Sequence, residues 1–310
     1  MTQETACTST GLSLGATLLL TLAIAIPATA QEGSSNSGAP GTGFGPETVE
    51  NGNNDEPVKQ GKTAQNLRAE KLLSNVHRFR LRNFRALNDY YVYTTDPEEE
   101  LATRISDHMD QSRQLLEQIK DQTGNSLTDS QMGDLKKAFN NFDDQMETNI
   151  EDVRESGYPD LRLLSDMANQ AQSLSVLSKN IYNQVAGQDA TPTETDLELA
   201  REASITMALM VTRYSARSSS SVAQVFQGAD SEQSLDDLAR SFENTLDKLR
   251  NRTEDDGKID ANLSDVNSKW RFIRGSYIEY DEQNVAFVIN RYSTSIIESL
   301  EQTIDRLKSA

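Results

Sequence analysis

The spacing of apolar residues from residue 62 to the end of the chain restricts the fold more than any other feature of this sequence. In two stretches apolar side chains recur every three or four residues, which places them on one side of an α-helix. One such seam comprises Met132, Leu135, Phe139, Phe142, Met146, Ile150 and Val153, and the other comprises Leu263, Val266, Trp270, Ile273 and Tyr277. Three prolines follow residue 60, namely Pro97, Pro159 and Pro192, and each stands at an expected helix end. We therefore predict an all-α fold.

Capping residues and glycines indicate where the helices begin and end. Asp96 and Pro97 suit an N-cap followed by proline in the first turn, and Gly124 and Gly157 suit helix ends. Residues 255–257 are expected to form a turn. These signals predict eight helices, over residues 62–93, 97–122, 128–155, 159–186, 195–227, 231–251, 260–279 and 282–308.

The order of the predicted helices indicates a duplication. A shift of 131 positions places Leu135 on Val266 and Phe139 on Trp270, and the second and sixth helices also match in seam pattern. We therefore predict two tandem antiparallel four-helix bundles, over residues 61–188 and 194–310.

The residues before the first bundle have a different character. Residues 14–26 form an apolar run that is too short to span a bilayer, and Ala28-Thr29-Ala30 follows it as a cleavage signal. Residues 1–13 lack Lys and Arg, so either the true start lies elsewhere or the signal is atypical. We predict a signal peptide over residues 1–30, cleaved after Ala30, a disordered linker over residues 31–60, and a periplasmic or secreted protein.

Charge and composition exclude several classes of function. The chain has 30 Lys plus Arg against 48 Asp plus Glu, a net charge of −18, so we expect no nucleic-acid partner. The two histidines, His77 and His108, do not have the spacing of a dimetal site, and neither a nucleophile motif nor a phosphate-binding glycine loop is present. We predict that the protein is not an enzyme and has no catalytic residue, metal or cofactor.

The first predicted helix carries the candidate site. Residues 71–88 contain four arginines and no Asp or Glu. At about 100° per residue, Arg80 falls within the apolar stripe of this helix, whereas Arg78, Arg82 and Arg85 share the opposite side. A guanidinium against a helix-bundle core needs an anionic or carbonyl partner, because an unpaired buried charge is costly. That partner is either a carboxylate of the protein or a ligand.

The segment from Arg78 to Arg85, followed by Tyr90 and by Asp96-Pro97-Glu98-Glu99, resembles the first helix of the PilJ/NarX-type extracytoplasmic sensory domain. Arg78, Arg80 and Arg85 fall on the arginines of that family's pattern. Residues 235–249 and 266–272 and the final helix are similar to the family's later helices. This resemblance implies a four-helix sensory domain that binds a small ligand or anion, with these three arginines as candidate ligand contacts.

The chain also departs from the family pattern. Leu81, Arg82 and Asn83 stand where the pattern has Met, Leu and Ser. In the second bundle Arg213 aligns with Arg78, but serines replace the other two arginines, which indicates a degenerate copy.

The sequence therefore supports two functional hypotheses. The first is an exported binding protein that holds a small anion through Arg78, Arg80, Arg85 and Arg213. Its other expected partners are a membrane-bound transducer or envelope protein and a second copy of the chain. The alternative is a structural or interaction module of the cell envelope without a small-molecule ligand, in which Arg80 pairs with an internal carboxylate.

Overall fold

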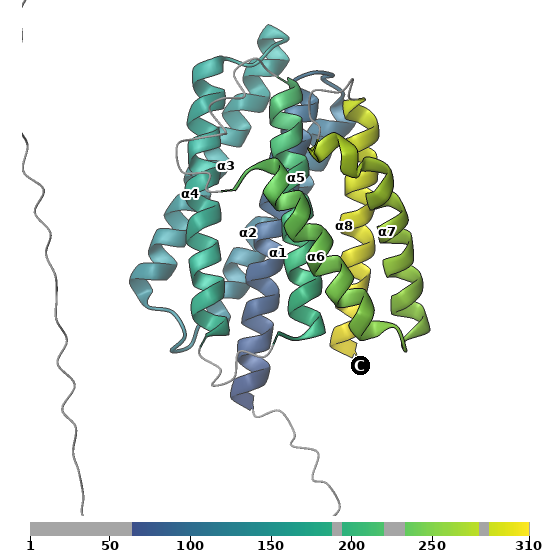
Figure 1. The fold of residues 1–310 in the computed structure, drawn as a ribbon. Helices are drawn as coiled ribbons and strands as arrows, with labels where there is room; N and C mark the ends of the chain where they lie inside the picture. The colour runs from purple at the N-terminus through teal and green to yellow at the C-terminus, as the bar shows by residue number, and fades with distance from the viewer. Residues whose placement is uncertain (1–63, 188–193, 220–232, 279–284, 310) are drawn as a thin grey trace, which may run out of the picture. The chain divides into compact units, whose positions relative to one another are not determined.

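The structure, a computed structural model, describes residues 64–187, 194–219, 233–278 and 285–309. The predicted signal peptide and linker lie outside these residues. Within them the protein is all-α, as predicted, and its regular elements are eight helices (Figure 1). These are α1 (Ala64–Tyr93), α2 (Glu99–Gln122), α3 (Asp129–Ser156), α4 (Leu161–Ala186), α5 (Asp196–Ser219), α6 (Leu235–Thr253), α7 (Gly257–Ile278) and α8 (Ala286–Ser309).

Several predicted boundaries are confirmed by their capping geometry. Gly157 ends α3 with φ of 78°, and Gly124 follows α2 with φ of 50°, a backbone conformation that glycine adopts without steric cost. Helix α3 begins with a capping box between Thr128 and Gln131. Local residue chemistry therefore sets these boundaries.

The predicted starts of α2, α4, α6, α7 and α8 are wrong by two to four residues; α4 begins at Leu161 instead of residue 159, and α8 at Ala286 instead of residue 282. Helix α2 begins at Glu99 with Glu98 as its N-cap, so Asp96 and Pro97 lie before the helix. Helix α6 begins at Leu235, because Ser234 forms a capping box with Asp237. The error at the start of α7 concerns the expected turn at residues 255–257, and the side chain of Asp256 explains it.

The expected turn at residues 255–257 ends one residue earlier than predicted. The Asp256 side chain accepts hydrogen bonds from the backbone N–H groups of Lys258 and Ile259, at 3.0 and 3.2 Å. These contacts satisfy two N–H groups in the first turn of α7, which therefore begins at Gly257 instead of residue 260.

Two hydrophobic clusters form the core. One is built mainly from α1–α4 and the other mainly from α5–α8, and both predicted seams are buried in them except for partly buried Met132. The clusters also exchange residues, because Leu81 and Phe84 of α1 belong to the second and Ala216 of α5 to the first. Figure 1 shows α1 and α5 side by side, with α3 and α4 on one side of them and α6–α8 on the other.

Helices α1 and α5 run in the same direction, and their polar contacts keep a nearly constant offset. His77 contacts Ser204, the Phe84 carbonyl accepts a hydrogen bond from Thr212, and Asn88 accepts one from Ser215, at offsets of 127, 128 and 127 residues. Glu70 and Arg201 extend this register with an offset of 131. The described residues belong to one compact unit, so the independence of the two predicted bundles stays a prediction.

None of the helices in the described ranges combines the length and the apolar character that a membrane span requires.

Candidate functional site

The arginines of α1 divide between two neighbouring helices. Arg78, Arg82 and Arg85 face α8, where they pair with Asp305, Glu301 and Glu298. Lys308 at the end of α8 donates to the Ser74 hydroxyl at 2.7 Å, so these contacts continue toward the start of α1. We call this set of α1 and α8 residues the polar seam. Arg80 lies on the other side of α1, as the helical spacing predicts.

The pairs in the polar seam differ in exposure. Arg82 Nη2 lies 2.7 Å from Glu301 Oε1, and the two side chains are only 19% and 22% exposed. Burial lowers the pKa of Arg82, and the Glu301 carboxylate opposes that shift. Arg78 and Asp305 are 44% and 60% exposed, so their contact at 3.1 Å is screened by water. Two of the predicted ligand contacts, Arg78 and Arg85, are thus paired with carboxylates of the protein itself.

Arg80 lines a pocket between α1 and α4. The lining side chains come from α1, α3 and α4 and comprise Arg80, Asn83, Phe84, Leu87, Phe142, Ala171, Gln172, Leu174, Ser175 and Ser178. The space between them measures about 360 Å³ and includes volume that is open to solvent. The part of it that water molecules can occupy is about 20 Å³, which is room for about one water molecule and far less than in most small-molecule sites. Arg80 is the only charged residue in the lining.

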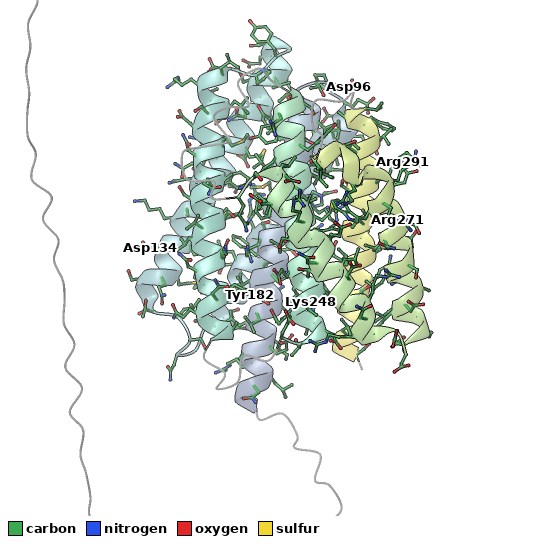
Figure 2. All side chains as sticks on the ribbon, in the orientation of Figure 1. Asp96, Asp134, Tyr182, Lys248, Arg271 and Arg291 are labelled. Carbon is green, nitrogen blue, oxygen red and sulfur yellow. The ribbon has the colours of Figure 1, made fainter. Side chains whose placement is uncertain are left out.

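Polar atoms in this pocket lack hydrogen-bond partners within the protein. They are Arg80 Nε and both polar atoms of the Asn83 side chain, and all three are buried. Among the described residues no carboxylate forms an ion pair with Arg80. Its guanidinium carbon lies 6.0 Å from the ring centre of Tyr182, which is labelled in Figure 2. Burial lowers the pKa of Arg80 to about 10, and the Tyr182 contribution opposes the shift. The pocket is therefore lined by a guanidinium that has no carboxylate partner and an unpaired Nε, and by an amide with two unpaired polar atoms.

Arg213 lies apart from this pocket. Its Nη1 donates to the Gln233 carbonyl at 2.7 Å, its Nε is buried without a partner, and burial lowers its pKa. The register between α1 and α5 places Arg213 opposite residues 82–86 rather than opposite Arg78. The four predicted arginines are therefore distributed over three surroundings and do not form one site.

Arg201 is fully buried, although it was not among the predicted site residues. Its side chain is 2% exposed and pairs with Glu70 of α1 and Glu198 of α5. Burial lowers the pKa of Arg201, but Tyr182 and both carboxylates favour the charged form. The pKa is therefore raised overall. The signal in the sequence was an arginine within the largely apolar segment from Leu199 to Val211. Tyr182 also donates to Glu198, so its phenol links the buried ion pairs to the pocket of Arg80.

The two histidines lie in the interior, within different polar groups. His77 contacts the Ser204 hydroxyl at 3.4 Å, and burial keeps its pKa well below the ordinary value. His108 Nε2 lies 3.7 Å from Asp89 Oδ2, yet burial and the nearby arginines lower its pKa to about 3. Across the described helices, His, Cys, Asp and Glu side chains form no group of three that could hold a metal ion.

Comparisons with protein-family models, with curated proteins and with solved structures gave no match.

Proposed function

We propose that this protein binds a small anion in the pocket between α1 and α4, with Arg80 as its charged contact. The observation that carries the proposal is the set of unpaired buried polar atoms on Arg80 and Asn83 in one pocket. Buried polar groups in folded proteins are normally hydrogen-bonded, and unpaired ones mark sites that water or a ligand fills. A guanidinium there selects for negative charge.

The electrostatic surroundings agree with a weakly bound ligand. The chain has a net charge of −18, which opposes the approach of an anion. Asp305, Glu301 and Glu298 pair with the other arginines of α1, so Arg80 alone supplies positive charge at the pocket. We expect dissociation constants nearer the millimolar than the nanomolar range.

The proposal includes export of the protein and transfer of the ligand-bound state to a membrane-bound partner, as in the sensory domains that the first helix resembles. The export signal lies outside the described residues, and the family resemblance stays a prediction.

A structural or interaction module of the envelope is the second candidate, and the polar seam favours it. Arg78, Arg82 and Arg85 all pair with acids of α8, so most of the arginine run is explained by contacts within the protein. Under this second candidate function, water molecules instead of a ligand hydrogen-bond to the unpaired groups of Arg80 and Asn83.

Replacement of Arg80 by Met tests the proposal, because Met keeps much of the side-chain volume and removes the charge. We expect an anion that raises the melting temperature of the parent protein to lose that effect in R80M. Each charge-assisted hydrogen bond contributes about 1.5–3 kcal/mol, so affinity should fall about 10- to 100-fold. Differential scanning fluorimetry with small anions measures the stabilisation, and calorimetric titration measures the affinity.

R78M is the matched control, because it makes the same change on the same helix outside the pocket. It should bind the anion as the parent does. Without ligand, R80M should melt at or above the temperature of the parent, since it removes an unpaired buried charge. Binding that survives in R80M, or a large fall in its melting temperature without ligand, would contradict the proposed site.

A further inference from the structure

Helix α7 has a face that points to solvent. The helix lies at the edge of the bundle, beside α6 and α8 (Figure 1). Its buried side chains recur every three or four residues, and so do the residues on the opposite side. These opposite residues are Gly257, Ala261, Ser264, Ser268, Arg271, Phe272 and Gly275, and all except partly buried Ser264 are exposed. We call this set the outer face of α7.

Two large side chains project from the outer face. Phe272 is 65% exposed, and its ring centre lies 4.9 Å from that of Tyr292 of α8. Arg271, labelled in Figure 2, is exposed and has no carboxylate partner among the described residues. The remaining members of the face are Gly, Ala and Ser. The outer face therefore offers both projections and recesses to another helix, which is how helices pack.

The packing of a single chain does not explain the glycine at position 275. Gly275 lies within α7, where glycine is less favourable than alanine. Its φ is not positive, and a Cβ atom at this position would meet no other described residue within 4 Å. Gly257 at the start of α7 is equally unrestricted. Glycine allows another backbone to approach closely, so a helix of a second molecule would give both glycines a structural role.

The charges of α7 suit a second copy of the chain. The helix has four basic and two acidic residues, whereas the whole chain carries a net charge of −18. Repulsion between two copies is therefore weaker at α7 than at an acid-rich helix such as α3. Asp260 lies on the same side of α7 as Arg271, because the 11 residues between the two positions correspond to about three turns. Neither forms an ion pair with another described residue.

We propose that two copies of this chain associate through the outer faces of α7, with the two helices antiparallel about a two-fold axis. In this arrangement Ser264 of one copy lies opposite Ser268 of the other. Gly257 then lies opposite Gly275, so the backbones can approach closely at both ends of the contact. This surface is separate from the proposed anion site, and the inference does not depend on that site.

The same arrangement accommodates the two large side chains. Ala261 of one copy leaves room for Arg271 and Phe272 of the other. Because the two-fold axis runs across the helices, each side of one outer face meets the same side of the other. Arg271 of each copy therefore comes beside Asp260 of the other, and two ion pairs form across the contact. A helix of 22 residues is about 33 Å long, so the interface is small and we expect a micromolar dissociation constant.

Analytical ultracentrifugation of the full chain over a range of concentrations tests the dimer. Ser268→Glu places a charge in the middle of the outer face, where a second copy would leave it buried and unpaired. We expect this variant to dimerise at least about tenfold more weakly than the parent, with an unchanged circular dichroism spectrum. Ser173→Glu is the matched control, because it makes the same change at an exposed position of α4. It should dimerise as the parent does.

A charge exchange tests the predicted ion pairs. Arg271→Glu should weaken the dimer by about tenfold, because it places a carboxylate beside Asp260 of the other copy. Asp260→Arg in the same chain restores opposite charges and should recover most of the lost affinity. An equal or greater loss in the double variant would contradict the predicted pairing.

Disulfide formation tests the direction and register of the two helices. Cys7 is the only cysteine of the chain, so all these variants also carry Cys7→Ser. A mixture of S264C and S268C should form a disulfide-linked dimer under mild oxidation, whereas each variant alone should not, because like positions are too far apart. Efficient linkage of either variant with itself would show that the helices are not antiparallel in this register. A parent protein that stays monomeric at submillimolar concentrations, or a dimer that S268E leaves intact, would overturn the proposed interface.

Discussion

Two arginines, Arg201 and Arg80, lie against the interior of this protein in different surroundings. Arg201 is paired with Glu70 and Glu198, whereas Arg80 has no carboxylate partner, lies 6.0 Å from the ring centre of Tyr182 and lines the same pocket as Asn83. Helical spacing placed Arg80 on the apolar side of α1 correctly, because that inference needs only one helix. The partners of both arginines come from other helices, and residue spacing within a helix carries no information about them.

The two buried histidines should make the protein sensitive to mild acid. His108 has a folded pKa of about 3 against an ordinary value of 6.5, and the pKa of His77 is also lowered. Below about pH 6.5 the unfolded chain therefore binds protons that the folded protein does not, so stability falls as pH falls. We expect His108 alone to remove about 2 kcal/mol of unfolding free energy between about pH 7 and pH 5.

Urea denaturation of the parent and of His108→Gln at the two pH values measures this effect. The variant should lose less unfolding free energy than the parent on acidification. The comparison between the two proteins is essential, because burial raises the pKa of neighbouring Asp89, and its titration acts in the opposite direction. Arg82, Arg85 and Arg104 keep the site positive throughout this range. An equal loss in both proteins would show that His108 does not carry the acid sensitivity.

At the scale of elements, the sequence predicted where the helices lie along the chain but not which helices pack against each other. The predicted ends at Gly157 and Gln122 agree with the structure to within two residues, since capping and spacing are local properties. The start of α7 was missed because Asp256 was assigned to a turn. Pairing of α1 with α8 was not predicted, because the acids involved lie more than 200 residues away along the chain.

The polar seam between α1 and α8 should be held mainly by its less exposed pair. We expect Arg82→Met to lower the unfolding free energy by about 1–2 kcal/mol, because Glu301 then loses its shortest contact. Arg78→Met should lower it by about 0.5 kcal/mol or less, since its pair with Asp305 is well exposed. Urea denaturation of both variants measures the difference.

A double-mutant cycle with Glu301→Gln separates the pair from other effects. The cycle with Arg82→Met should show coupling of about 0.5–1 kcal/mol that decreases as salt is added. Arg85 also contacts Glu301, at 3.3 Å, so E301Q should cost more than R82M alone. Equal losses in R82M and R78M would mean that exposure does not determine the strength of these pairs.

At the scale of the whole molecule, the duplicated sequence pattern corresponds to the pairing of α1 with α5. The shift of 131 residues that aligns the seams is close to the offsets of 127 to 131 residues between contacting side chains of the two helices. If the predicted duplication is correct, equivalent parts of its two copies face each other. Helix α5 is buried around most of its surface. The burial of α5 on most sides was not predicted, because a helix with apolar residues on all sides has no single apolar stripe in its sequence.

The pairing of α1 with α5 predicts how the two halves behave when separated. Residues 62–190 and 191–310 each contain four helices and most of one hydrophobic cluster, so each fragment should be substantially helical by circular dichroism. Each should be less stable than its half in the intact chain, because separation removes the partner helix. Arg201 would also lose Glu70, and removal of one partner of a buried ion pair is strongly destabilising.

Mixing the fragments should therefore restore stability through a one-to-one complex. Analytical ultracentrifugation measures the complex, and thermal melting measures the recovered stability. Ser204→Glu provides the specific control, because Ser204 is fully buried and contacts His77 of α1, so an unpaired charge there should prevent recovery of the parent melting temperature. Asp247→Glu, a conservative change at an exposed position of α6, should leave association unchanged. If both fragments are unfolded alone, the helices form one inseparable domain and the predicted division near residue 190 is wrong. If both fold but do not associate, each repeat is an independent domain, and the contact between α1 and α5 contributes little to the stability of the intact protein.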